Sequence, residues 1–146
     1  DLIISIEVLR YLDTNIVIES YKDMYRTLKP KGKIFITHVN TLATEGYFVF
    51  YHLKKIAHSF KGKEYHSAYF TTAQKERRVL KEIGFKEIHC IGRMFATVRT
   101  GYKFGKKIGK AYAKILETFN PRQRFTKTMF KNLAGHLIVI AEKQGS

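Results

Sequence analysis

Two short apolar runs on either side of one amphipathic segment constrain the fold most strongly. The runs are residues 2–6 and 34–37, and their nearly continuous apolar character is typical of strands covered on both faces. Apolar residues of the segment between them recur with the period of a helix, and Pro30 ends that pattern. Strand, helix and strand with short joints form a right-handed crossover, so the two strands are predicted to be parallel.

The rest of the chain continues this alternation. Thr71 and Gln74 form a capping box before an apolar helical stripe, and Gly84 stands where a left-handed residue ends a helix. Residues 86–91 and 137–141 are two further apolar runs and are predicted to be strands. No repeat and no linker divides the chain, so residues 1–146 are predicted to form a single α/β domain.

Composition limits the kinds of partner and the cellular compartment that are expected for this chain. Lys and Arg number 27 against 12 acidic residues, a formal net charge of +15, which favours contact with a polyanion; a solvated lysine-rich surface is an equally good explanation. Cys90 is the only cysteine, which excludes an internal disulfide and fits a reducing compartment. The start lacks the basic region of a secretory signal, so a cytoplasmic location is expected.

Three motifs in order resemble one enzyme family. They are D-x6-V-L-x-x-L at residues 1–12, L-K-P-K-G at 28–32, and a helix ending in Gly84-Phe85. They resemble the C-terminal half of a class I S-adenosylmethionine-dependent methyltransferase, in which the second motif commonly reads L-K-P-G-G. The match runs from Asp1 to about Ile91 and resumes in the last strand. It implies a Rossmann-like fold with a mostly parallel sheet, an antiparallel last strand and flanking helices.

Two cofactor-holding features of that family are missing from these 146 residues. They are the glycine-rich loop after its first strand and the acidic residue that closes its second. Gly101, Gly105 and Gly109 lie instead in a lysine-rich helical stretch, where close helix packing is the expected role. Residues 1–146 are therefore expected to be a partial domain, the C-terminal half of a larger enzyme, and to be inactive in isolation.

The resemblance also implies a cofactor site and its chemistry. The cofactor would be S-adenosylmethionine, in contact with the residue matching Ile6, and Ser5 and Glu7 would flank it; core packing is the alternative for Ile6. His38 follows the second strand and is the candidate general base, or else a hydrogen-bonded loop histidine. Some relatives that methylate quinone precursors read E-V-L-E-H and bind a metal, whereas residues 7–11 read E-V-L-R-Y, so no metal site is expected.

The methyl acceptor is expected to be a small or lipid-like molecule with an oxygen or carbon nucleophile. Neither N-P-P-Y nor a Pro-Cys nucleophile occurs, which removes the familiar routes to nucleobase methylation. In this family the segment after the second strand is often a substrate lid, here residues 41–70. The candidate substrate contacts, with core packing as the alternative, are Asn40, Tyr47, Tyr51 and His52.

A basic helical insertion is predicted at residues 94–132, before the last strand. Its apolar stripe is flanked by lysines that could contact an anionic membrane surface, namely Lys103, Lys106, Lys107, Lys110 and Lys114. The alternative is a stripe packed on the sheet with solvated lysines. A different class of function is also open: a non-catalytic methyltransferase-like binding module that holds an anionic partner or membrane surface on its basic face. Nucleic-acid binding is not supported, because the sequence contains no RNA-binding motif and no zinc motif.

Overall fold

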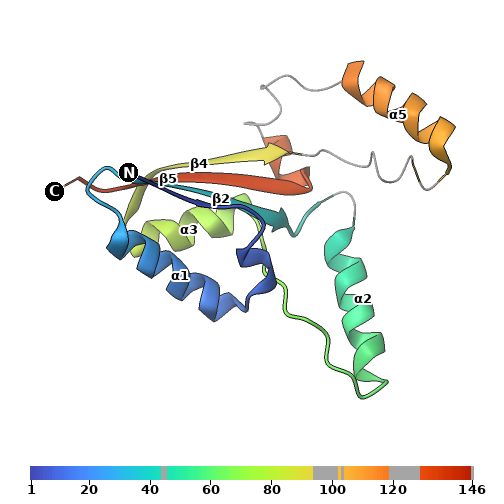
Figure 1. Ribbon diagram of the computed structural model, residues 1–146, viewed down its shortest axis with the longest axis horizontal. Helices are drawn as coiled ribbons and strands as arrows, with labels where there is room; N and C mark the ends of the chain where they lie inside the picture. The colour runs from blue at the N-terminus through green and yellow to red at the C-terminus, as the bar shows by residue number, and fades with distance from the viewer. Residues whose placement is uncertain (44–45, 94–101, 103, 119–128, 146) are drawn as a thin grey trace.

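The computed structural model describes residues 1–43, 46–93, 102, 104–118 and 129–145. Strands and helices alternate along them (Figure 1). In chain order, the elements are β1 (Leu2–Ser5), η1 (Leu9–Tyr11), α1 (Thr14–Thr27), β2 (Lys33–Asn40), α2 (Tyr47–Ser59), β3 (Phe70–Thr71), α3 (Ala73–Ile83), β4 (Phe85–Arg93), α5 (Lys106–Thr118), η2 (Met129–Leu133) and β5 (His136–Lys143).

One sheet with the strand order β1-β2-β5-β4 organises the molecule. β1 and β2 are parallel, as the crossover predicted, and the short β3 pairs in parallel with the end of β2. β5 is antiparallel to both of its neighbours, β2 and β4. Among the described strands only β5, the last in sequence, is reversed, which confirms the predicted sheet.

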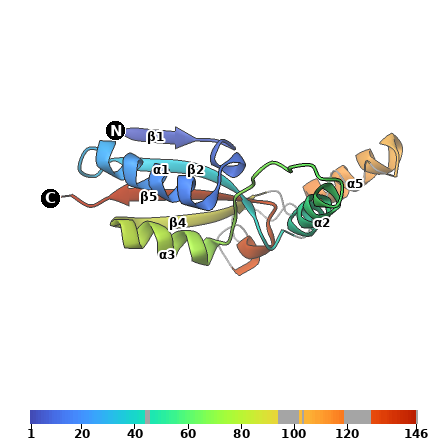
Figure 2. The same cartoon turned by 90° about the horizontal axis from the view of Figure 1, so that it is seen from below.

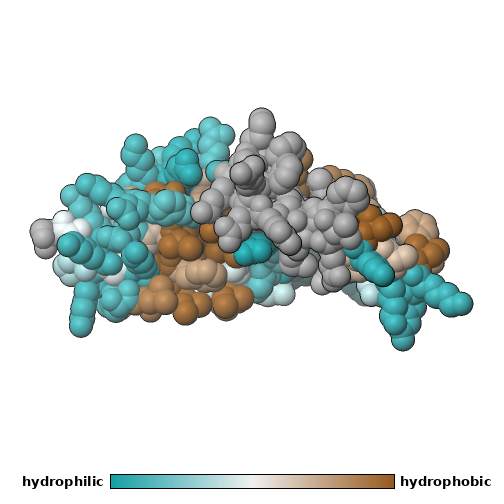
Figure 3. All heavy atoms as spheres, turned by 90° about the horizontal axis from the view of Figure 1, so that it is seen from above, coloured by the Kyte–Doolittle hydropathy of each residue, from teal (hydrophilic) through white to brown (hydrophobic). Residues whose placement is uncertain are grey.

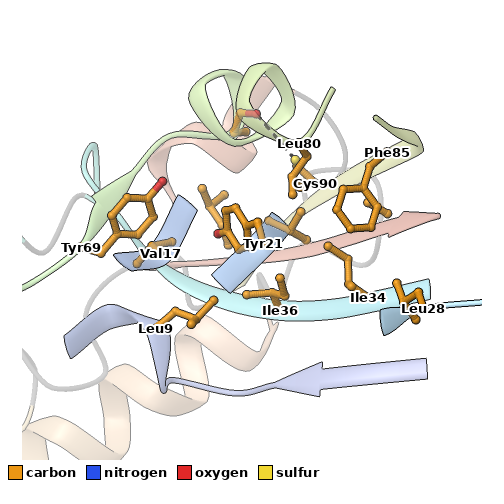
Figure 4. Packing of buried hydrophobic residues seen from close by; sticks show 14 residues of the cluster. Leu9, Val17, Tyr21, Leu28, Ile34, Ile36, Tyr69, Leu80, Phe85 and Cys90 are labelled. Atoms are coloured by element: carbon orange, nitrogen blue, oxygen red, sulfur yellow. Dashed lines mark hydrogen bonds between the residues drawn. The ribbon is translucent and has the colours of Figure 1, made fainter. Parts of the chain in front are cut away.

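Helices α1 and α3 cover the same face of this sheet, with α1 over β2 and α3 over β4 (Figure 2). The core lies between these layers (Figure 4), and Ile34 and Ile36 of β2 point into it together with Val17 and Tyr21 of α1. The apolar positions of α1 recur at helical spacing, so one side of the helix is buried while its charged side faces solvent.

Two turns need backbone that is left-handed. Gly84 ends α3 with φ +116°, and its N–H donates to the carbonyl oxygens of Leu80 and Lys81, as the capping pattern predicted. Lys31, at the position of the first glycine in the family motif, has φ +62°. The lysine keeps the turn at the cost of a conformation that glycine adopts freely.

The second face of the sheet lies opposite α1 and α3 (Figure 2), and apolar side chains gather at its surface (Figure 3). Ile4, Phe35 and Ile140 are register partners across three strands and lie on this face, opposite the buried Ile34 and Ile36. Ile4 is 58% exposed, and Phe35 and Ile140 are half-buried. We call this surface, formed by Leu2, Ile4, Phe35, Ile138 and Ile140, the open sheet face. β1 also pairs with β2 alone among the described strands.

The structure describes most of the predicted lid and only part of the predicted basic insertion. Residues 41–70 contain α2 and the first residue of β3. The insertion at residues 94–132 contains α5 and all but the last residue of η2. Residues 44–45, 94–101, 103 and 119–128, which include Lys103, lie outside the described residues. None of the described helices has the length and apolar character that a membrane span requires.

Candidate functional site

A cleft of about 550 Å³ lies where β1 and β2 end. Ser5 and Ile36 pair near the carboxyl ends of these parallel strands, while the antiparallel β5 begins and β4 ends at the same edge. Ligands of open α/β sheets bind at this edge, beyond the carboxyl ends of the strands. The side chains that line the cleft include Ile6, Glu7, Thr37, Tyr47, Arg93 and His136.

Glu7 is the centre of the polar contacts in the cleft. Its backbone has φ +60°, and its N–H donates to Thr37 Oγ1 at 2.8 Å. Its carboxylate accepts a hydrogen bond from Arg10 and lies 2.8 Å, Oε1 to Nδ1, from His136. A left-handed φ is unusual for residues other than glycine and occurs where surrounding contacts stabilise it. The contacts of Glu7 stabilise this conformation.

These contacts determine the charge of Glu7. Burial alone would raise the pKa of its carboxyl, but the hydrogen bond from Arg10 and the charge of His136 together lower the pKa below its ordinary value. Glu7 is therefore an acceptor at neutral pH. In its neutral form, an imidazole whose Nδ1–H donates to a carboxylate keeps its lone pair on Nε2, which is the arrangement of a base oriented by an acid. The contact with Glu7 thus orients the His136 ring in the cleft.

The predicted cofactor residues lie in or beside this cleft. Ile6 is 58% exposed and lines it together with Glu7. Ser5 is buried at the end of β1, and its side chain is not part of the lining. The structure therefore places Ile6 and Glu7 at the predicted edge and leaves Ser5 as their support.

His38 lies elsewhere than the sequence predicted. β2 continues to Asn40, so His38 is a strand residue whose side chain faces α1 and α3, with none of its surface exposed. Its Nε2 lies 2.5 Å from Tyr21 Oη, which in turn donates to Glu76 Oε2 at 2.9 Å. Tyr69 Oη donates to Glu76 Oε1 at 2.6 Å. His38 is thus part of a buried hydrogen-bond network and does not line the cleft, a position that argues against the role of base.

Of the predicted substrate residues, one lines the cleft and three do not. Tyr47 lines the cleft. Asn40 is fully buried, and its Nδ2 donates to the carbonyl oxygens of Asn132 and Ala134, so it anchors the turn before β5. Tyr51 is buried and donates to the His66 carbonyl oxygen at 2.5 Å. His52 is exposed and packs against Phe48 and Phe70. These three residues hold the segment in place.

His136, Thr37 and Arg10 were not singled out from the sequence. A signal for His136 existed, because an antiparallel last strand must begin at the edge where the parallel strands end. The first residue of that strand, directly after Gly135, therefore belongs to the cleft. Within the described part of the chain, no cluster of three or more His, Cys, Asp or Glu side chains could hold a metal ion.

The buried position of His38 has a measurable consequence for stability. Burial lowers the pKa of His38 from its ordinary 6.5, although Glu76 and Glu7 act in the opposite direction. The unfolded chain therefore binds a proton at His38 in a window below pH 6.5 in which the folded chain does not. We expect the free energy of unfolding to be unaffected by His38 above this window and to decrease on acidification within it, by at most about 1.4 kcal/mol per pH unit.

Urea denaturation between neutral pH and pH 5 measures this slope. The His38→Gln variant should lose part of the slope, whereas His89→Gln, at an exposed position of β4, should keep it. An unchanged slope in His38→Gln would contradict the expectation.

Comparison with known proteins identifies the fold. The sequence matches no protein-family model and no curated protein. Its structure is similar to an S-adenosylmethionine-dependent methyltransferase from Thermotoga maritima, with a TM-score of 0.61 and 14% identity over 99% of this chain and 56% of that one. A second such enzyme, from Archaeoglobus fulgidus, has a TM-score of 0.52 and 14% identity, with 98% of this chain and 59% of that one covered.

A third similar structure is phosphoethanolamine N-methyltransferase 2 of Haemonchus contortus in complex with phosphomonomethylethanolamine and S-adenosylhomocysteine. Its TM-score is 0.56 at 15% identity, and 99% of this chain and 33% of that one are covered. The chain therefore has the fold of class I methyltransferases, as its motifs implied, and spans little more than half the length of the first two solved relatives.

Proposed function

We propose that this chain takes part in methyl transfer from S-adenosylmethionine to a small or lipid-like acceptor in the cleft at the carboxyl edge of the sheet. The observation that carries the proposal is the Glu7–His136 pair in that cleft, at the edge where open α/β sheets bind ligands. Class I methyltransferases share the fold, and the similar Haemonchus contortus enzyme was solved with S-adenosylhomocysteine. These facts support the cofactor that the sequence motifs implied.

Residues at the end of β1 would hold the cofactor. Ile6 offers an exposed apolar surface in the cleft, Ser5 supports it from the core, and Glu7 supplies negative charge. S-adenosylmethionine brings a methyl group on a positively charged sulfonium, which becomes a neutral thioether after transfer. An ionised Glu7 therefore favours the charged cofactor over the spent one.

His136 is the base that the geometry favours for a hydroxyl acceptor. His136 Nε2 would accept the proton that a hydroxyl acceptor releases when it is methylated. Glu7, which accepts from Nδ1, stabilises the imidazolium, and Thr37 and Arg10 hold Glu7 in place. A carbon acid of the acceptor could lose its proton to the same atom.

Residues 41–70 are proposed to close over the acceptor. Tyr47, at the start of α2, lines the cleft and would contact the acceptor directly. Tyr51 and His52 pack against Phe70, and Asn40 ties the end of β2 to the turn before β5, so these residues would position the lid.

The cleft has only part of the wall that the cofactor requires. The glycine-rich loop and the acidic strand end of the family do not occur in the 146 residues. The open sheet face offers an apolar surface beside the edge of β1 that no other described strand pairs with. We propose that an N-terminal cofactor-binding half packs on that face and edge, and that this chain alone is inactive.

A second function remains open on the same observations. Without the cofactor loop, the fold could serve as a binding module that uses its basic surface, including the α5 lysines Lys106 and Lys107, for an anionic partner. Binding of S-adenosylmethionine in the cleft separates the two functions, because only the first requires it.

Nuclear magnetic resonance provides that test. We expect millimolar S-adenosylmethionine to shift the backbone amide signals of residues 5–11, 37–43 and 135–138 and to leave those of α3 unchanged. Glu7→Gln should weaken the binding, whereas Glu82→Gln, an exposed glutamate on α3, should not. No shifts at millimolar cofactor would favour the binding module. Micromolar affinity by calorimetry would contradict the proposal that the cofactor site is incomplete.

A further inference from the structure

An apolar stripe runs along the outer side of α2. Val49, Leu53, Ile56 and Phe60 recur at helical spacing, and all four are more than half exposed, with Phe60 at 88%. Surface residues of this size normally occur singly, so a contiguous row marks an interaction surface. We call this row the α2 stripe.

The opposite side of α2 makes the contacts with the rest of the fold. Tyr51 is the buried residue of this helix, and its ring packs against Tyr65 and Phe70. At 100° per residue, Tyr51 lies about 160° around the helix from Leu53. The stripe therefore points away from the body of the protein, and no described residue covers it.

The charge around the stripe is mostly positive. Residues 46–63 contain four lysines and no acidic residue. Lys54 and Lys55 are exposed on the helix, and Lys61 and Lys63 follow Phe60 in an exposed turn. None of the four forms an ion pair with another described residue. Their charge is therefore available to a partner.

We propose that α2 docks on an anionic membrane surface, with the α2 stripe inserted among the lipids and the lysines at the headgroups. Exposed apolar residues flanked by cations are the features of helices that lie in the plane of a membrane interface. The lysines are attracted by anionic lipids, while the stripe needs an apolar environment that a nucleic acid does not provide. A second copy of this chain would bring four more lysines against the first four, which disfavours self-association through this helix.

Two further features agree with this orientation. α5 carries exposed Ile108 and Ile115 together with lysines, and it extends from the same end of the molecule as α2 (Figures 1 and 2). Tyr47, in the first turn of α2, lines the cleft. The helix that carries the stripe thus also forms part of the wall of the cleft. Docking itself does not depend on methyl transfer.

Vesicle co-sedimentation of the 146-residue chain tests the proposal. We expect binding to phosphatidylcholine vesicles that contain phosphatidylserine to be at least about tenfold stronger than to phosphatidylcholine alone. Leu53→Ser with Phe60→Ser should weaken it at least about tenfold, because both side chains lose their insertion into lipid. Lys54→Gln with Lys55→Gln should weaken it as well. The matched pair Lys81→Gln with Lys86→Gln removes equal charge from exposed positions of α3 and β4 and should preserve binding.

Several results would overturn the proposal. Equal binding to both kinds of vesicle would exclude recognition of anionic lipid, and equal loss in the two lysine pairs would reduce it to diffuse charge. Unchanged vesicle binding by Leu53→Ser with Phe60→Ser would exclude the stripe. Sedimentation velocity gives an independent readout: conversion of a dimer to a monomer by these serines would show that a second copy covers the stripe. Circular dichroism of each variant checks that the fold is intact.

Discussion

Replacement of Glu76 by alanine is expected to lower the free energy of unfolding by about 3–5 kcal/mol. Glu76 has no exposed surface and accepts hydrogen bonds from the hydroxyls of Tyr21 and Tyr69 at 2.9 and 2.6 Å. Without it, two buried hydroxyls lose their acceptor and a cavity remains between α1 and α3. His38 also loses the partner that orients Tyr21 toward it.

Urea denaturation followed by circular dichroism measures this loss. Glu82→Ala is the matched control, since it removes a glutamate from the same helix at an exposed position and should change the unfolding free energy by less than about 0.5 kcal/mol. Glu76→Gln retains an acceptor oxygen and should fall between the two. If Glu76→Ala costs no more than Glu82→Ala, the network does not contribute to stability.

At micromolar concentrations the chain is expected to self-associate through the open sheet face. Leu2 and Ile4 are 56% and 58% exposed on β1, which pairs with β2 alone among the described strands. An exposed strand edge beside an apolar face is a template for pairing with another chain. Leu2→Lys with Ile4→Lys should weaken the association at least about tenfold, because each buried side chain of this size contributes about 1.5–3 kcal/mol.

Sedimentation velocity over a range of concentrations measures the effect. Ile16→Lys with Leu42→Lys places the same charges at two similarly exposed apolar positions away from the sheet face and should leave the association unchanged. A wild-type chain that sediments as a monomer at high concentration would contradict the prediction. The serine variants of the α2 stripe should also leave this association unchanged, since the stripe lies on a different element.

The order of the larger elements could be predicted from local patterns, whereas the short β3 was not predicted and the N-cap of α3 is Thr72 rather than the predicted Thr71. The runs at 2–6 and 34–37, with a helix between them, predict the parallel crossover that the structure shows. Gly84 marked the end of α3 because few other residues adopt its φ. These signals are local, and a short stretch of sequence is enough to detect each of them.

The site could be predicted only in part, because it depends on strand lengths and on contacts between distant residues. His38 was placed at the edge because the second strand was expected to end at Thr37. Extension of β2 to Asn40 moved His38 into the core. Glu7 and His136 are separated by 129 residues, and only the reversal of β5 brings them together. No sequence pattern near Glu7 or near His136 predicts that the two residues pair.

The position of β5 has a consequence for how the polypeptide acquires its structure during synthesis. β5 is the last strand in sequence, yet it lies between β2 and β4 and supplies the hydrogen bonds that join them. Until residues 136–143 have been synthesised, β2 and β4 have no shared neighbour among the described strands, and the pairs that join them cannot form. The middle of the sheet therefore closes only through pairings between strands that are distant in sequence, and such pairings form late and slowly in folding.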